Sequence, residues 1–535
     1  MKTKKLVAVL LACVLIFSVV AVAGCDGPAL DDSDTSLIIE MHEGGYGSEA
    51  MTKVARAFEL AYADKGYKVT LAPGSLTAQS IKNALSYGPT LTKTDLYLSG
   101  AINWRGIYAE GSTLCAGYET VLEDLTTMYG QKVYGEDVLF GDKIQAQAKE
   151  AFSTTNADGS VSQYAAPWCG GPNGFAYNAA LFTQYGWELP RTTDELLALA
   201  AEIKAKSVYP FAFTNAASYW NWIAITWWAQ LAGVDEVNDF FNAVSPNVDD
   251  GQTMTPLAFQ TLSRLKAIKM VDSCIGNGTD GWCHPDSLKK DHIEMQRLLY
   301  NGSNQVVFFP SGDWCQNEMK LNGYPVSDSV GFMRVPVMSD ILYDGVGNAN
   351  GGKGNFVYET IRNDATLSAV IAAIDNGQTS YAGVSADDFA SIKLARSWTP
   401  GGSAQCGAVI PTYATAKQAA KDFLLFLASD EAMQIIYDTT GCLIAYDTTN
   451  ITTGSNTSLY ATQMLNTYKN VRYVNDAQST NPIFYNTDLT PFPGRMEMKF
   501  ATTDPNDQMT GTEYFQDIVA QVELNWDNYL ALAVG

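Results

Sequence analysis

Two tryptophans of this chain directly follow a side chain that can hydrogen-bond a hydroxyl group, in the pairs Asn103-Trp104 and Asp313-Trp314. A pyranose ring has an apolar C–H face that stacks on a flat indole, while its hydroxyls need carboxylate or amide partners. Each pair supplies both kinds of contact. We therefore expect these four residues to contact a carbohydrate ligand.

Six tryptophans, including these two, stand where a loop or the start of a helix is expected. The chain has 11 tryptophans, and those in such positions are Trp104, Trp168, Trp220, Trp222, Trp314 and Trp398. Most tryptophans fill a core or an interface, so for Trp168, Trp220 and Trp222 a binding role and a packing role both stay open. Glu43 could bond a sugar hydroxyl or cap the helix that follows it.

No constellation of catalytic residues stands out in the sequence. His42-Glu43 begins like a zinc-protease motif, but Tyr46 occupies the place of the second histidine. The Gly-rich stretches at 170–174 and 351–354 lack the spacing of a phosphate-binding loop, and there is no Gly-x-Ser-x-Gly elbow. A glycoside hydrolase would need two opposed carboxylates, and none of the 57 acidic residues is singled out for that role. We predict no catalytic residue and no cofactor.

The first 25 residues predict an exported lipoprotein. Lys2, Lys4 and Lys5 precede an apolar run over residues 6–20, and Val22-Ala23-Gly24-Cys25 follows. This order is typical of a secretory signal, and the tetrapeptide resembles the lipobox of bacterial lipoproteins, whose cysteine is acylated. An ordinary signal peptide or an N-terminal membrane helix is the alternative. We predict a signal peptide over 1–24, an acylated Cys25 and a flexible polar tether to residue 35.

Composition and charge narrow the partners. With 535 residues, 47% of them hydrophobic, the chain is long enough for two sizeable cores. Its 34 basic and 57 acidic residues give a net charge of −23, which repels nucleic acid. We expect no nucleic-acid partner, a monomer, and a location on the outer face of the cell membrane, with contact to the membrane through the lipid anchor alone.

Seven cysteines follow Cys25, an odd number that leaves at least one thiol free. Cys274 and Cys283 bracket a Gly-rich loop and are the best candidates for a disulfide in an exported protein. His284 and His292 come next, but the spacing of these four residues fits no tight zinc-chelating pattern, so we predict no metal site.

Apolar periodicity predicts alternating strands and helices. Strands are expected at 36–41, 67–71 and 95–98, and a helix from about 49 to 62 carries its apolar residues at helical spacing. Thr192 and Glu195 have the spacing of a capping box at the start of a further helix. Helices are also expected near 420–427 and after Ser429, and loops at 345–355 and 448–458. This order favours a parallel α/β sheet covered by helices.

Several segments, in order along nearly the whole chain after residue 36, resemble the family of sugar-binding proteins of bacterial ABC importers that includes maltose-binding protein. They are Leu37 to Phe58, Gly174-Phe175-Ala176-Tyr177-Asn178, Pro190 to Ile203, Tyr209-Pro210-Phe211, Gly302 to Trp314, and Lys417 to Gly441. The segment at about 358–398 departs from the family pattern, because it is expected to form extra helices. The resemblance adds weight to Trp104 and Trp314, which match the family's ligand loops.

The resemblance implies an α/β, two-lobed periplasmic-binding-protein-like fold, with several hinge crossings and the ligand in the cleft between the lobes. We expect lobe 1 to contain 36–165 plus 338–440, and lobe 2 to contain 166–337 plus 441–535. The crossings are expected near 163–168, 331–337 and 441–446.

The function that the resemblance implies is capture of a carbohydrate, most simply an oligosaccharide, for the permease subunits of an ABC importer. A lipid-anchored glycoside hydrolase is one alternative. A sugar-binding sensor or adhesin component without transport is another.

Overall fold

A computed structural model describes residues 34–156, 158–245, 253–276, 281–300, 305–343, 358–400, 406–474, 481–485 and 487–534. The chain divides into two compact units, Met1–Asp31 and Asp32–Gly535, and all described residues belong to the second. The predicted signal peptide, Cys25 and all but the last two residues of the tether lie outside the described residues, as does the loop predicted at 345–355.

The first sheet has five strands in the order β2-β1-β3-β12-β6. They are β1 (Ser36–His42), β2 (Lys68–Gly74), β3 (Leu96–Leu98), β6 (Ala166–Pro167) and β12 (Gly407–Val409). β1 runs parallel to β2 and β3, whereas β12 is antiparallel to both of its neighbours. In β1 the buried Leu37, Ile39 and Met41 alternate with more exposed residues. The three strands predicted in this part are confirmed.

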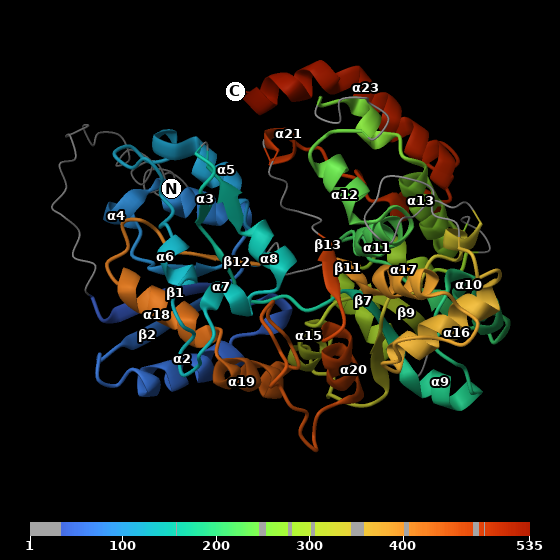
Figure 1. The fold of residues 1–535 in the computed structure, drawn as a ribbon, viewed down its shortest axis with the longest axis horizontal. Coiled ribbons are helices and arrows are strands. Elements are labelled where there is room, and N and C mark those ends of the chain that lie inside the picture. Colours follow the sequence, from blue (N-terminus) through green and yellow to red (C-terminus); the bar gives the residue numbers. More distant parts are fainter. Residues whose placement is uncertain are drawn as a thin grey trace, which may run out of the picture. The chain divides into compact units, whose positions relative to one another are not determined.

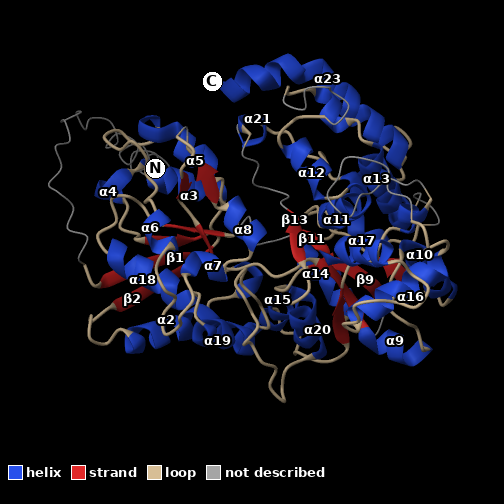
Figure 2. Cartoon of the chain, viewed as in Figure 1, coloured by secondary structure: helices blue, strands red, loops and turns tan. Residues whose placement is uncertain are grey.

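Nine helices among the described residues belong to the same part of the chain as this sheet and pack around its strands (Figures 1 and 2). They are α2 (Glu49–Ala61), α3 (Ala78–Ser86), α4 (Gly88–Leu91), α5 (Trp104–Glu110), α6 (Thr126–Tyr129), α7 (Phe140–Lys143), α8 (Ala146–Ala151), α18 (Lys417–Leu427) and α19 (Asp430–Thr440). The buried Phe58 of α2 stacks on Tyr67 and meets Phe423 of α18 edge-on, with ring centroids 5.4 and 5.2 Å away. The end of the chain's middle region thus packs against its beginning.

The second sheet has four strands in the order β10-β7-β9-β8. They are β7 (Gly174–Asn178), β8 (Tyr209–Phe211), β9 (Val306–Ser311) and β10 (Val330–Met333). β9 is parallel to β8 and antiparallel to β7, and every residue of β7, β9 and β10 is buried. Strands covered on both faces read as continuous apolar runs rather than as an alternation.

The remaining α-helices pack on the second sheet or on one another. They are α9 (Ala179–Tyr185), α10 (Thr193–Ala205), α11 (Trp220–Ala232), α12 (Val234–Phe241), α13 (Leu262–Ile275), α14 (His292–Gln296), α15 (Cys315–Leu321), α16 (Asp364–Asp375), α17 (Ala386–Ser397), α20 (Leu459–Tyr468), α21 (Pro482–Tyr485), α22 (Met496–Ala501) and α23 (Gly511–Val534). The predicted capping box of α10 is present: the Thr192 side chain accepts from the Glu195 amide, and the Glu195 carboxylate accepts from the Thr192 amide. The helices predicted near 420–427 and after Ser429 are α18 and α19.

The chain passes between the two sheets at three places. It does so from β6 to β7, from β11 (Trp398–Pro400) to β12, and after α19 towards α20, which packs on β10. β11 itself pairs with β13 (Arg472–Val474). The segment 358–398 forms the predicted extra helices, α16 and α17, and their buried side chains belong to the same hydrophobic cluster as Phe175 and Phe308 of the second sheet.

For residues 358–400 this packing differs from the predicted assignment of 338–440 to lobe 1, whereas β12, α18 and α19 lie with the first sheet as that assignment expects. The packing also differs from the predicted crossing near 331–337, because the chain stays with the second sheet until β11. Each of the helices α16 and α17 has an apolar face, and the sequence does not indicate on which sheet that face packs. The boundaries of the lobes as a whole stay a prediction.

The predicted Cys274–Cys283 disulfide is absent, since Cys274, buried at the end of α13, and Cys283 are both free thiols. Among the described helices, none combines the length and the apolar character that a bilayer crossing demands.

Glu497 of α22 is a carboxyl group buried without a partner. It is 0% exposed, and within the described structure neither of its oxygens accepts a hydrogen bond. Burial raises the pKa of Glu497 to about 7, and nearby Arg495 offsets only part of that effect. The folded chain therefore holds a proton there at pH values where an unfolded glutamate has lost it.

We expect the free energy of unfolding to fall as pH rises from about 4.5 to about 7 because of this group. The contribution is fully present below the unfolded pKa and is lost above the folded one. Glu497→Gln keeps a neutral side chain of the same shape, so its stability relative to the parent should grow over that window. Urea denaturation at pH 4.5, 6 and 8 measures the difference. The exposed Glu202→Gln is the control, and a parent–variant difference that does not change with pH would contradict the assignment.

Candidate functional site

The sharp turn Gly312–Trp314 joins the end of β9 to the start of α15. A Cβ atom on Gly312 would lie 2.2 Å from the ring of Trp314 and 2.4 Å from Oδ1 of Asn173, so only glycine fits there. The turn leaves the indole of Trp314 half-buried while Asp313 points inward and is only 1% exposed. The two residues that the sequence pairs therefore have different environments.

The carboxylate of Asp313 joins three distant segments. Oδ2 accepts from the backbone amide of Leu443 at 2.8 Å, Oδ1 accepts from the hydroxyl of Tyr46 at 3.3 Å, and the amide of Gly171 is a further donor. Burial raises the pKa of Asp313 to about 6, and these hydrogen bonds keep it from rising further. Because its lone pairs are used by the protein, Asp313 positions the site and offers little to a ligand.

Five aromatic rings, here called the aromatic cluster, gather around this turn: Tyr46, Trp168, Tyr219, Trp222 and Trp314. Trp222 meets Trp314 edge-on at 5.4 Å and stacks on Tyr219 at 4.5 Å. Tyr46 lies 6.4 Å from Trp314 and 5.8 Å from Trp168. Trp168 is buried, whereas the other four residues are half-buried. The rings come from the turn after β1, the segment after β6, the start of α11 and the turn after β9.

Polar groups border the aromatic cluster. His292 lies 6.3 Å from the ring of Tyr219, and its Nε2 is 3.4 Å from Oε1 of Glu318. The hydrogen bond to Glu318 raises the pKa of His292 above its usual value. At the end of β1, burial lowers the pKa of His42, whose Nδ1 has no hydrogen-bond partner among the described residues. These groups can donate to, or accept from, the hydroxyls of a polar ligand.

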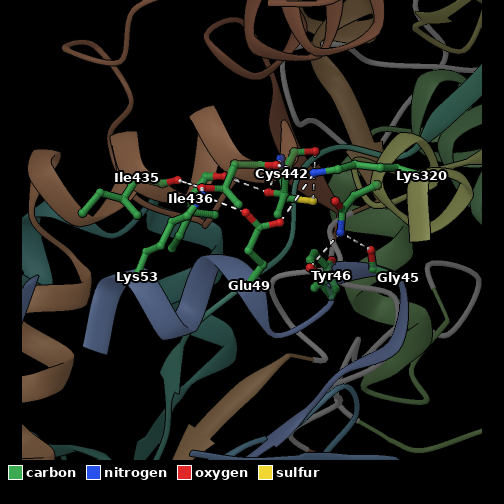
Figure 3. A network of polar contacts seen from close by, with 11 residues as sticks. Gly45, Tyr46, Glu49, Lys53, Lys320, Ile435, Ile436 and Cys442 are labelled. Carbon is green, nitrogen blue, oxygen red and sulfur yellow. Dashed lines mark hydrogen bonds and ion pairs between the residues drawn. The ribbon is translucent and has the colours of Figure 1, made fainter. Parts of the chain in front are cut away.

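Figure 3 shows the polar contacts that hold the turn after β1 against α15. The side-chain amide of Asn317 donates to the carbonyls of Gly45 (2.9 Å) and Tyr46 (2.8 Å), which lie in the 3-10 helix η1 (Gly44–Tyr46). Lys320 of α15 and Lys53 both pair with Glu49, at 3.6 and 2.8 Å. The two ion pairs are exposed and stabilise little, so the buried amide of Asn317 is the main restraint on Tyr46.

Space beside the aromatic cluster is limited. A Cβ atom on Gly45 would lie 2.7 Å from Cδ1 of Trp314, so the backbone of η1 touches that indole directly. The cavity enclosed by Tyr46, Trp168 and Cys442 measures only about 20 Å³. A sugar ring does not fit inside this cavity.

Four of the residues predicted from the sequence are brought together here: Trp168, Trp222, Asp313 and Trp314. Trp168 is held by a hydrogen bond of 2.7 Å from its Nε1 to the carbonyl of Ser99.

The structure places the other predicted residues elsewhere. Trp104 is 0% exposed in a separate hydrophobic cluster, where its Nε1 donates to the carbonyl of Ala151 at 3.3 Å. Trp220 is also 0% exposed and lies between Phe175 and Phe211. Their burial gives no support to a binding role, which stays a prediction.

Two predicted polar residues accept hydrogen bonds from within the protein. Asn103 caps α5 by accepting from the amide of Gly106 at 2.9 Å. Glu43 precedes η1 and accepts from the hydroxyl of Ser48 at 3.1 Å. Both remain partly exposed, so a ligand contact for them also stays a prediction.

Sequence reasoning missed Tyr46, Tyr219, His292 and Glu318. One signal was available, because Tyr219 and Trp222 are three residues apart and so share a face at the start of a helix. The other contacts join residues far apart in the chain, and no local pattern indicates them.

Comparison with known proteins supports one family. Residues 44–272 match the family model described as bacterial extracellular solute-binding protein. The diacetylchitobiose binding protein NgcE of Streptomyces coelicolor is 26% identical over 148 residues, a match that covers 28% of this chain and 28% of that relative. The chain thus spans well under a third of the length of this curated relative.

Solved structures share the fold over far more of the chain. A chitin oligosaccharide binding protein is 14% identical, with a TM-score of 0.53, over 90% of this chain and 99% of its own. A probable secreted solute-binding lipoprotein from Streptomyces coelicolor is 13% identical, with a TM-score of 0.55, over 92% and 100%. A maltose-bound T. maritima MalE3 is 14% identical, with a TM-score of 0.54, over 91% and 99%. Identities this low concern the fold alone.

The family match and the fold agree with each other and with the two α/β sheets joined by repeated crossings. Residues 44–272 are therefore similar to the bacterial extracellular solute-binding proteins, and the chain shares its fold with solved sugar-binding and solute-binding proteins.

Proposed function

We propose that this protein captures a carbohydrate, an oligosaccharide in particular, outside the cytoplasm and delivers it to the permease subunits of an ABC importer. The observation that carries the proposal is the aromatic cluster, whose half-buried rings of Tyr46, Tyr219, Trp222 and Trp314 meet at one place. Accessible indole and phenol faces are suited to the C–H faces of sugar rings. The protein acts as a monomer in this proposal.

The composition of the cluster's border supports the same ligand class. His292, which contacts Tyr219, is paired with Glu318, so the border offers paired polar groups rather than a concentrated charge. The relatives whose names state a ligand bind diacetylchitobiose, chitin oligosaccharides, raffinose or maltose, all of them sugars. These sugars define the panel on which the proposal is tested.

A ligand that lies over these rings would contact residues from segments next to both sheets. Tyr46 follows β1 of the first sheet, whereas Trp314 follows β9 of the second sheet and Trp222 lies in α11, which contacts β9. Such a ligand stabilises the arrangement in which the two sets of rings are close, by as much as its affinity for that arrangement exceeds its affinity for others.

Tryptophan substitutions test the site. Trp314→Ala and Trp222→Ala should each weaken binding of the tightest sugar of the panel by about 2 kcal/mol, roughly thirtyfold, because a ring that stacks on the ligand is lost. Trp104→Ala and Trp526→Ala should instead lower the melting temperature, since both rings are buried away from the cluster. Calorimetric titration with thermal melts separates the two effects.

Two outcomes would contradict this placement. One is a Trp314→Ala variant that binds its sugar as tightly as the parent. The other is an equal loss of affinity in a Trp526→Ala protein that melts normally. A parent protein that binds no sugar of the panel would contradict the ligand class itself.

We further infer that the protein does not cleave what it binds. Glycoside hydrolysis requires an acid and a base on opposite sides of the bond, whereas the two buried carboxylates next to the aromatic cluster, Asp313 and Glu318, are both engaged by protein donors. Prolonged incubation with the panel, followed by chromatography, should return every sugar intact. Hydrolysis that disappears in Glu318→Gln would favour the alternative, a lipid-anchored glycoside hydrolase.

The lipid anchor rests on Val22-Ala23-Gly24-Cys25. We propose that Cys25 is acylated and holds the protein on the outer face of the cell membrane. Cys25→Ala should leave the protein unacylated and move it from the membrane fraction to the soluble fraction of cells that express it. Mass spectrometry checks the modification, Cys115→Ala is the control, and unchanged partitioning of Cys25→Ala would contradict the anchor. Permease genes next to this one would favour transport over a sensor or adhesin role.

A further inference from the structure

A cavity of about 1000 Å³ lies where α16, α17 and α20 end, beside β10 and the start of β13. None of the rings of the aromatic cluster lines it. Six cationic side chains and a single carboxylate do: Arg191, Arg334, Lys393, Arg396, Lys469 and Arg472, with Asp375. In a chain whose net charge is −23, this is a concentrated excess of positive charge.

Two of the arginines belong to the structure of the cavity wall. Arg396 grips Asp375 with two hydrogen bonds, Nε to Oδ1 at 3.1 Å and Nη2 to Oδ2 at 2.9 Å. Arg334 approaches the same carboxylate, with Nη1 3.7 Å from Oδ1, and donates to the carbonyl of Arg396. One carboxylate thus faces two guanidinium groups. Burial, and to a lesser extent the charge of Arg396, lowers the pKa of Arg334 to about 9, although Asp375 opposes this shift.

The other four cations add to this excess. Among the residues that the structure describes, no ion pair joins Arg191, Lys393, Lys469 or Arg472 to an acid, although Arg191 lies near enough to Asp375 to lower the pKa of that carboxyl. Lys393, Lys469 and Arg472 are exposed, so their long side chains can reach a bound molecule.

Helix dipoles account for part of this arrangement only. Cations are favoured at helix C-termini; Arg396 lies in the last turn of α17, and Lys469 is the C-cap residue of α20. Arg191, however, immediately precedes the N-cap of α10, where the helix dipole disfavours a positive charge. Arg472 lies in β13, which has no such dipole. The convergence of these two side chains on the same cavity has no explanation within the fold.

We propose that this cavity is an anion site that binds a phosphate-bearing molecule. Arginine forks match phosphate oxygens with two parallel hydrogen bonds, and a recess lined by one sign of charge concentrates counter-ions. The amides of Gln378 and Asn466 line the same space and supply neutral donors. The volume exceeds what phosphate alone needs and accommodates an organic body as well. A soluble phosphate compound and the headgroup of an anionic phospholipid share this chemistry.

Calorimetric titration of the purified protein with inorganic pyrophosphate at low ionic strength is the test. We expect binding that weakens steeply as salt is added. The double variant Lys393→Glu/Lys469→Glu should lose at least tenfold in affinity, because two side chains that line the cavity become repulsive. Lys68→Glu/Lys289→Glu, which reverses the same charge at two exposed lysines elsewhere, should keep the parent's affinity. Thermal melts check that both variants fold.

The source of the phosphate group is read from a second probe. Glycerophosphoglycerol, the soluble headgroup of phosphatidylglycerol, carries one negative charge, whereas pyrophosphate carries more. Tighter binding of pyrophosphate assigns the site to a soluble polyanion, and tighter binding of glycerophosphoglycerol assigns it to a lipid headgroup. A parent protein that binds neither probe at low salt would overturn the proposal. So would an equal loss of affinity in both double variants, since only net charge would then matter.

Discussion

The carboxylate of Asp313 is buried at the point where the chain passes between its two sheets. It accepts hydrogen bonds from the amides of Leu443 and Gly171, which belong to two of the three crossings, and from the hydroxyl of Tyr46, which follows β1. A buried carboxylate is costly unless donors surround it. The donors can surround it only if these three segments keep one mutual arrangement, so this requirement constrains where the crossings and the neighbouring turn can lie.

The aromatic cluster follows from that constraint. Once Tyr46 is held by Asp313 and by the amide of Asn317, its ring stands beside Trp314, and the stacked pair Tyr219 and Trp222 completes the surface. The carboxylate of Asp313 thus bonds groups of the protein itself, while the half-buried residues of the site are aromatic. Such a surface suits a neutral ligand with both C–H and hydroxyl groups better than it suits a charged one.

The sequence predicts regular elements well and exposure poorly. Apolar spacing identifies β1, α2 and the capped start of α10, because these patterns depend on near neighbours. It does not distinguish Trp104 from Trp222, although both stand near the start of a helix. Trp104 is buried in a hydrophobic cluster with Phe152 and Tyr164, whereas Trp222 is half-buried. The predicted placement of α16 and α17 in lobe 1 is wrong for the same reason. Their apolar faces could pack on either sheet, and in the folded protein they pack on the second.

The distribution of charge in the folded protein is also not predictable from the sequence. The net charge of −23 describes an acidic protein, yet the basic cavity draws its cations from positions between 191 and 472, which no local charge run would reveal. Folding brings them together because the ends of α16, α17 and α20 meet beside β10, and Asp375 compensates only part of the charge. Repulsion among cations held this close raises the free energy of the fold. The cavity retains this repulsion although it takes no part in the aromatic cluster. An anionic ligand would relieve the repulsion on binding, which is the role that we propose for it.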